Sequence, residues 1–189
     1  MNTPAHIIVG AALFSQKGAP RITAAAVTGA MLPDLSLYLL AGISLMLLQI
    51  PPERVFNELY FSSSWQTIFA VDNSLILWGG LMGLALWKGH GPARAFSGAG
   101  LAHIALDLPL HHDDGRAHFW PLTDWVFQSP VSYWDSHHHA GLFAPLGGAL
   151  IAVLTWVLWQ RFPAWPARVA FLVLLAAEIW VIRQWILFF

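Results

Sequence analysis

Long runs of apolar residues, separated by short polar stretches, follow one another along this chain of 189 residues. A helix needs roughly 20 apolar residues to cross a bilayer core of about 30 Å. Three runs reach this length, and they are 66–86, 138–159 and 166–188. A fourth run, 95–110, is shorter and more polar. These runs predict membrane-spanning helices rather than the strands of a sheet.

The first fifty residues have a less regular pattern. Residues 4–15 predict a short helix, and an apolar stretch covers residues 22–50. Pro33 and Asp34 interrupt this stretch, and proline tends to kink or break a helix. We therefore predict six membrane segments, of which the first two are short or broken. The expected fold is an all-α, polytopic membrane helical bundle, with residues 1–189 forming a single integral-membrane domain.

The composition supports a membrane protein and excludes several other classes. The chain is 57% hydrophobic and only 10% charged, whereas a typical soluble domain is about 45–50% apolar and about 25% charged. The net charge is −1 and the basic residues are scattered, so a nucleic-acid partner is not expected. The absence of cysteine excludes disulfides, thiolate zinc sites and a cysteine nucleophile.

The basic residues predict an orientation in the membrane. With six segments, one side carries Lys17, Arg21, Lys88, Arg94, Arg161 and Arg168. The positive-inside rule makes that side cytoplasmic. Both chain ends and the loop 111–137 then face outward, which in a bacterial inner membrane is the periplasm. If Pro33 instead splits the second run into two segments, this orientation inverts for everything after it.

Most of the polar chemistry lies between His103 and His139, which hold seven of the nine histidines. Three adjacent histidines, 137–139, cannot share one helix face, and they favour a wet loop. His103 and Asp107 are four residues apart, so in a helix they share a face. Ionisable residues within a membrane span are costly and need a partner or a polar cavity. The pair suits two metal ligands, a carboxylate that orients an imidazole, or a hydrogen-bonded pair with no further role.

A comparison of depth extends this pair to a larger group. Counted from the nearest basic residues at about 1.5 Å per residue, five ionisable groups lie roughly 14–20 Å into the membrane. These groups are His6, Asp34, His103, Asp107 and Glu178. Two histidines and three carboxylates suit zinc, or manganese if oxygen ligands dominate.

The loop that follows adds further candidates. Pro109 is expected to end or kink the helix, so that the loop folds back over the membrane segments. His111 continues the helix face of His103 and Asp107 and becomes a further metal ligand if the helix survives Pro109. The same polar loop would also be typical of a segment that binds surface ions.

Four side chains of this loop suit catalytic roles. Asp113 or Asp114 could serve as general base towards a metal-activated water, with His118 as an acid. Arg116 suits a phosphate or carboxylate on the substrate.

These residues resemble a group of small bacterial proteins described as membrane-bound (inner-membrane) metal-dependent hydrolases. The shared features are His6 before an apolar stretch, the Leu-Pro-Asp at 32–34, His103-x-x-x-Asp107, and Gly115 followed by an aromatic-Trp-Pro at 119–121. The run 103–111 is also similar to the zinc-ligand pattern of helical zinc-dependent phospholipases C.

One departure from that group concerns the number of metals. Its members commonly carry a His-Arg…Thr-His stretch between the second and third hydrophobic segments, but residues 51–65 contain no histidine. The sequence therefore leaves open whether the protein binds one metal ion or two. His111, His112 or the pair Asp113–Asp114 could replace the missing ligands.

The sequence favours a metal-dependent hydrolase that acts on a lipid or lipid-linked substrate. The expected metal ligands are His6, Asp34, His103 and Asp107, with His111 or Glu178 in addition. A transporter or channel for a metal ion or proton is the first alternative, because intramembrane acids and histidines also mark ion pathways. The scarcity of polar residues in the cytoplasmic third of the spans counts against it. A non-catalytic membrane scaffold is the second alternative.

Overall fold

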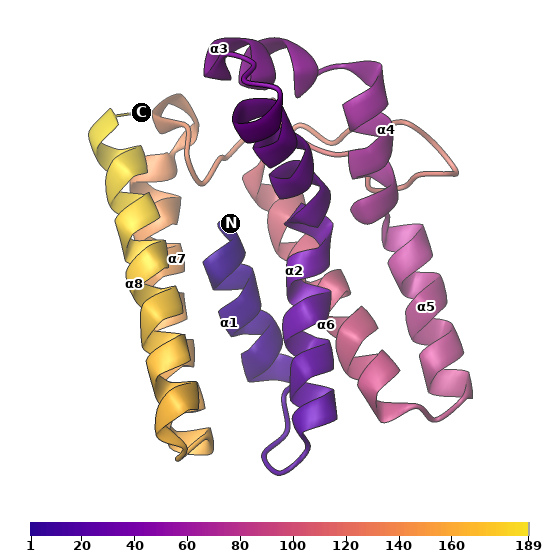
Figure 1. Cartoon of the computed structure of the whole chain (residues 1–189), viewed down its shortest axis with the longest axis vertical. Coiled ribbons are helices and arrows are strands. Elements are labelled where there is room, and N and C mark those ends of the chain that lie inside the picture. The colour runs from indigo at the N-terminus through magenta and orange to yellow at the C-terminus, as the bar shows by residue number, and fades with distance from the viewer. Residues whose placement is uncertain (189) are drawn as a thin grey trace.

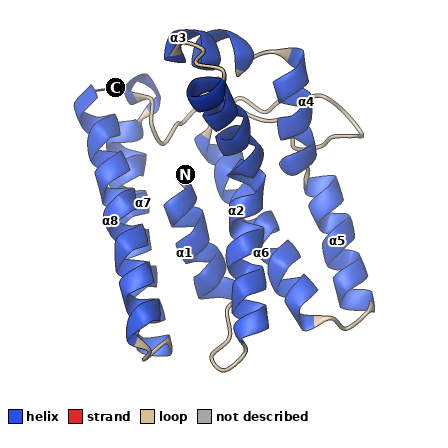
Figure 2. Cartoon of the chain, in the orientation of Figure 1, coloured by secondary structure: helices blue, strands red, loops and turns tan. Residues whose placement is uncertain are grey.

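The computed structural model describes residues 1–188, which form helices joined by loops, without a strand among them (Figure 2). The α-helices are α1 Thr3–Phe14, α2 Pro20–Gly42, α3 Pro52–Arg54, α4 Ser63–Asp72, α5 Leu75–Trp87, α6 Gly91–Asp107, α7 Ala140–Arg161 and α8 Trp165–Phe188. The shorter turns are η1 Ile43–Leu47, η2 Val55–Leu59, η3 Leu108–Leu110 and η4 Ser136–His138.

Four helical stretches are long and apolar enough to cross a membrane, and they are Pro20–Leu47, Ser63–Trp87, Ala140–Arg161 and Trp165–Leu187. They confirm the predicted helical membrane bundle. α1 is a shorter apolar helix of 12 residues, and α6 has 17 residues. Six complete spans therefore stay a prediction, although a helical segment lies at each of the six predicted places.

The short first segment forms the centre of the bundle. Small and apolar residues occur on all sides of α1, and Ala5, Ile8 and Ala11 have no exposed surface. A helix that is apolar all round is stable only when other helices surround it, and α1 packs against α2, α6, α7 and α8. Met1 is consequently buried inside the bundle (Figure 1), whereas the sequence analysis placed this end on the outer side.

The second segment is not split at its proline. α2 runs through Pro33 and continues into the π turn η1, so the alternative in which Pro33 splits this stretch into two segments does not apply. α2 lies close against α6 because Gly29 has no side chain: a β-carbon there would lie 2.0 Å from the carbonyl oxygen of Phe96. This close approach lies in the first half of both helices, and further along them His103 of α6 reaches Ala30 and Asp34 of α2.

The third predicted segment, 66–86, is broken near its middle. α4 ends at Asp72 and α5 begins at Leu75, and the loop after α6 fills the gap between them. The backbone N–H of Leu75 donates to the carbonyl oxygen of His118 at 2.8 Å, and the Ser74 hydroxyl donates to that of Trp120. The stretch predicted at 66–86 is therefore long and apolar enough to cross a membrane, but it consists of two helices, and backbone and side-chain groups at the break bond to the loop.

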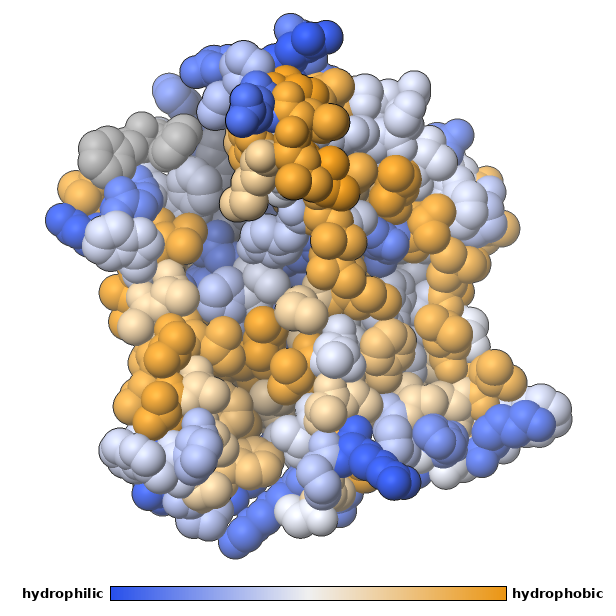
Figure 3. Space-filling model, in the orientation of Figure 1, coloured by the Kyte–Doolittle hydropathy of each residue, from blue (hydrophilic) through white to orange (hydrophobic). Residues whose placement is uncertain are grey.

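The connections between helices divide between two ends of the bundle. The turns that join α1 to α2, α5 to α6 and α7 to α8 lie at one end, and α3 lies at the other with the long loop after α6 (Figure 1). An apolar band separates hydrophilic groups at the two ends (Figure 3). All six basic residues predicted to be cytoplasmic lie in these turns or within four residues of them.

The absence of native cysteine makes this arrangement directly testable. We expect Lys88→Cys and Asp124→Cys, both at exposed positions, to react from opposite sides of the membrane. In intact cells a membrane-impermeant maleimide should label Asp124→Cys alone, and Lys88→Cys only after permeabilisation. Equal labelling of both in intact cells would contradict the predicted orientation.

Candidate metal centre

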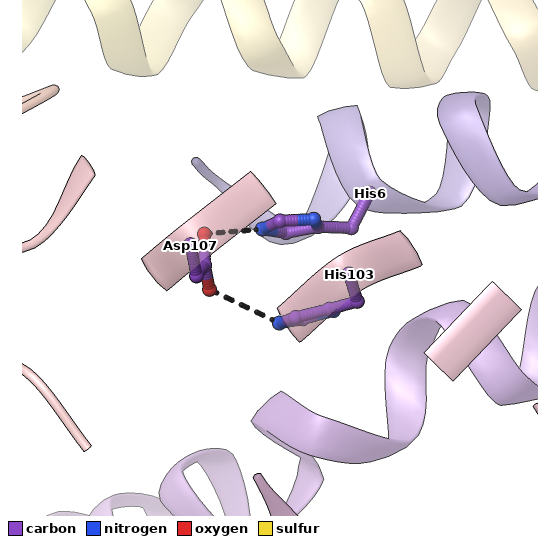
Figure 4. Close-up of side chains that lie close together, drawn as sticks. All are labelled: His6, His103 and Asp107. Atoms are coloured by element: carbon purple, nitrogen blue, oxygen red, sulfur yellow. Dashed lines mark ion pairs between the residues drawn. The ribbon is translucent and has the colours of Figure 1, made fainter. Parts of the chain in front are cut away.

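Two histidines and an aspartate form a buried group where α1 and α6 meet (Figure 4). Nε2 of His6 lies 2.9 Å from Oδ1 of Asp107, and Nε2 of His103 lies 3.2 Å from its Oδ2. The two imidazole rings stack with centroids 3.6 Å apart. Both rings therefore present Nε2 to the same carboxylate.

The hydrogen bond at the other nitrogen of His103 determines which atom can bind a cation. Nδ1 lies 2.7 Å from the backbone oxygen of Ala30, and a carbonyl oxygen can only accept, so Nδ1 carries the hydrogen. In the neutral ring Nε2 then carries a lone pair. This atom lies 3.2 Å from a carboxylate oxygen of Asp107 and 3.6 Å from one of Asp34. A lone pair against two carboxylates requires a proton or a metal ion between them. A backbone carbonyl that holds the second nitrogen is typical of metal-binding histidines.

Asp34 of α2 and His111 after η3 extend the group to five possible ligands. Nε2 of His111 lies 3.6 Å from Oδ1 of Asp107, and neither this atom nor Nε2 of His103 has a hydrogen bond. Ligand atoms bonded at about 2.0–2.1 Å to one tetrahedral ion lie roughly 3.3–3.5 Å apart. The ligand atoms of His6, His103 and Asp107 lie within 4.8 Å of one another, so these three residues could hold a metal ion, with Asp34 and His111 beside them.

Asp114 holds His111 from the side remote from Asp107. Its Oδ2 lies 2.9 Å from Nδ1 of His111 and accepts a hydrogen bond from Nε1 of Trp134. Burial raises the pKa of Asp114, but the hydrogen bond and charge of His111 outweigh burial, so the pKa lies below its usual value. Oδ1 of Asp114 has no hydrogen bond.

A cavity of about 260 Å³ opens beside this group. Asp34, Asp107, His111 and Asp114 contribute to its wall. Hydrophilic side chains are visible in the recess between α8 and α2 (Figure 3). His6 and His103 lie behind the wall, so their shared aspartate is the group's main contact with the cavity.

Arg116 provides the one arginine side chain in the described lining of this cavity. Its Nη2 donates to the hydroxyl of Tyr60 at 2.6 Å, and its guanidinium lies 4.3 Å from the ring centre of Phe69. Nη1 is buried without a hydrogen-bond partner. A fixed guanidinium with an unused donor suits an anionic group, as the sequence predicted.

The other predicted site residues are placed differently. His118 lines the cavity, and its Nδ1 donates to the carbonyl oxygen of Asn73 at 3.0 Å. Burial lowers the pKa of His118, so the neutral ring with an accepting Nε2 is favoured and suits a base better than the predicted acid. Asp113 is exposed and outside the cavity lining. Glu178 of α8 accepts from Asn2 and lines a separate cavity, so the structure does not bring it to the metal group.

Sequence reasoning missed several groups that complete the site. The α-amino group of Met1 forms an ion pair with Asp107, and the hydroxyl of Thr3 donates to Asp34. Tyr38 hydrogen-bonds to the same hydroxyl at 2.8 Å. None of these groups belongs to a recognisable spacing pattern.

The break between α4 and α5 did have a signal in the sequence, which is the adjacent polar pair Asn73–Ser74 within an apolar run.

The site and fold together define a helical membrane protein with a buried His/Asp group that can hold a metal ion. Comparison with protein-family models, curated proteins and solved structures finds no significant match.

Proposed function

We propose that the protein is a membrane-embedded metal-dependent hydrolase that cleaves an ester or phosphoester bond of a lipid or lipid-linked substrate. One observation carries the proposal: a buried His/Asp group with orphaned ligand atoms reaches the wall of a cavity through Asp107, and Arg116, which has an unused donor, lines the same cavity. The resemblance to membrane-bound metal-dependent hydrolases implies the same chemistry.

Each residue of the site has a separate role in the proposed reaction. His6, Asp34, His103, Asp107 and His111 would hold the ion. A bound zinc or manganese ion supplies a Lewis acid that lowers the pKa of a coordinated water towards about 7 and polarises the scissile group. Oδ1 of Asp114 would take up the proton of the water, with Nε2 of His118 as the second acceptor. Arg116 would hold the charged oxygens of the substrate.

The position of the site supports a substrate from the membrane. The cavity lies between helices that are apolar enough to cross a bilayer, so a lipid can reach it from the side. We expect a bacterial inner-membrane location with the cavity towards the periplasm, because the turns near most of the basic residues lie at the opposite end.

The packing below the metal group counts against the transporter alternative. A β-carbon on Gly10 would lie 2.6 Å from Ala30, and one on Gly98 would lie 2.5 Å from the ring of Phe14. Ion pathways need polar groups through the full thickness of the membrane. Small residues in tight contact do not provide them on this side of the cavity.

The proposal is tested by hydrolysis with the metal-loaded protein. Zinc- or manganese-loaded protein in mixed micelles should hydrolyse members of a panel of ester and phosphoester lipids. Arg116→Gln should lower kcat/KM for the phosphoester by about 10- to 100-fold, since a charge-assisted hydrogen bond contributes about 1.5–3 kcal/mol, and should leave bound metal unchanged. Asp113→Asn is the matched control and should retain both activity and metal.

The alternatives predict other outcomes in the same preparation. Loaded protein that hydrolyses none of the panel, but carries ions into liposomes in a manner abolished by Asp107→Asn, would establish transport instead. Protein that neither hydrolyses lipids nor retains metal would support the scaffold.

A further inference from the structure

A second cavity lies next to the first, and we propose that it holds a hydrocarbon chain of the substrate while Arg116 contacts the anionic head. The inference rests on the proposed function and extends it, because it defines the substrate as an amphiphile with a phosphate-type head.

The two cavities are neighbours with different walls. The second measures about 200 Å³ and shares Met1, Asn2 and Tyr133 with the first. Most of its other lining residues are apolar, and they include Leu106, Leu110, Phe143, Ala144, Leu150 and Ile182. Ligand pockets commonly measure about 300–1,000 Å³. Each cavity alone is smaller than this range, but the two together lie within it, as one elongated ligand would require.

The second cavity opens towards the lipid. Leu146 and Leu150 of α7 belong to its lining and are 57% and 45% exposed. α7 is one of the helices long and apolar enough to span the membrane, so these exposed faces meet acyl chains. The α7–α8 hairpin stands to one side of α1 (Figure 1). A chain can therefore enter sideways from the bilayer without passing through water.

Glu178 indicates that the occupant is not a plain hydrocarbon. This side chain is 2% exposed and lines the second cavity. Its Oε1 accepts from Nδ2 of Asn2 at 3.1 Å, but Oε2 is buried without any hydrogen bond. A buried carboxyl oxygen without a hydrogen bond is costly. A hydroxyl or amide N–H near the junction of head and chain would satisfy it, and Asn2 lies at that junction because it lines both cavities.

The test is photolabelling with a phosphatidic acid that carries a diazirine in one acyl chain. We expect labels on the lining residues of α6 and α7 in purified protein, and no dependence on turnover. Ala144→Phe fills the second cavity from a buried position and should reduce these labels at least five-fold. Ala149→Phe, at an exposed position on the same helix, is the matched control and should leave them unchanged. Leu150→Trp at the rim provides the same comparison if Ala144→Phe does not fold.

A diacylglycerol with the same diazirine chain separates head from chain. Arg116→Gln should reduce labelling by the phosphatidic acid and leave that by diacylglycerol unchanged. Labels scattered over lipid-facing residues, or lining labels unaffected by both cavity-filling variants, would overturn the chain site. Lining labels in a protein that hydrolyses no lipid would reject the proposed hydrolysis while retaining the binding site. Hydrolysis without labels on the lining residues would reject the chain site while retaining the proposed hydrolysis.

Discussion

Replacement of Asp107 by asparagine is expected to abolish stoichiometric metal binding. Both carboxylate oxygens face histidines, with His6 at 2.9 Å from Oδ1 and His103 at 3.2 Å from Oδ2. Asparagine keeps the shape but removes the charge and one acceptor oxygen. Loss of an outer-shell partner already costs about 10- to 100-fold in metal affinity, so loss of the shared ligand should cost more than 100-fold.

The measurement is elemental analysis of protein that has been equilibrated with zinc or manganese and then desalted. Wild type and Asp113→Asn should retain the ion, and Asp107→Asn should not. A ligand that binds only the folded state at 1,000 times its Kd stabilises by about 4.1 kcal/mol. A chelator should therefore lower the melting temperature of wild type but not of Asp107→Asn. If Asp107→Asn retains as much metal as wild type, the ion binds at a site that does not include Asp107.

Replacement of Gly29 by leucine is expected to prevent folding. A β-carbon at this position would lie 2.0 Å from the carbonyl oxygen of Phe96 and 2.7 Å from its carbonyl carbon. Both atoms belong to the backbone of α6, so no side-chain movement can relieve the contact and the helices must separate. The carbonyl of Ala30 would move away from His103 at the same time. The arrangement of the buried His/Asp group would therefore be lost together with the contact between α2 and α6.

Gly42→Leu offers a control on the same helix, because no atom lies within 4 Å of a β-carbon there. Size-exclusion chromatography in detergent should give a single symmetric peak for Gly42→Leu and aggregate for Gly29→Leu. If Gly29→Leu elutes as wild type and binds metal, α2 and α6 are not packed this closely.

Depth along the membrane was sufficient to predict most of the buried His/Asp group. His6, Asp34, His103 and Asp107 were placed at similar depths from the sequence, and the structure brings them together because α1, α2 and α6 are mutual neighbours. Glu178 lies on α8, where it contacts Asn2 instead. Depth describes position along a helix axis, and it contains no information on which neighbour a side chain faces.

The remaining differences arise from contacts between distant parts of the chain. An average over the apolar run 66–86 hides the polar pair Asn73–Ser74, because the strongly apolar residues after it dominate. The bond from Arg116 to Tyr60 joins two loops that are 56 positions apart. No local periodicity encodes such a contact. Tertiary packing determines it, and with it the direction of the guanidinium.

The broken helix between α4 and α5 also constrains the order in which the protein is made. The groups at Ser74 and Leu75 bond to Trp120 and His118, which the ribosome adds more than forty residues later. During synthesis the Ser74 hydroxyl and the Leu75 backbone N–H therefore lack these partners, and they must be hydrated or in contact with the insertion machinery until the loop is made. The loop after α6 then enters the gap and completes the segment. The cavity, whose wall includes both Asn73 and His118, is therefore complete only after this loop has been made.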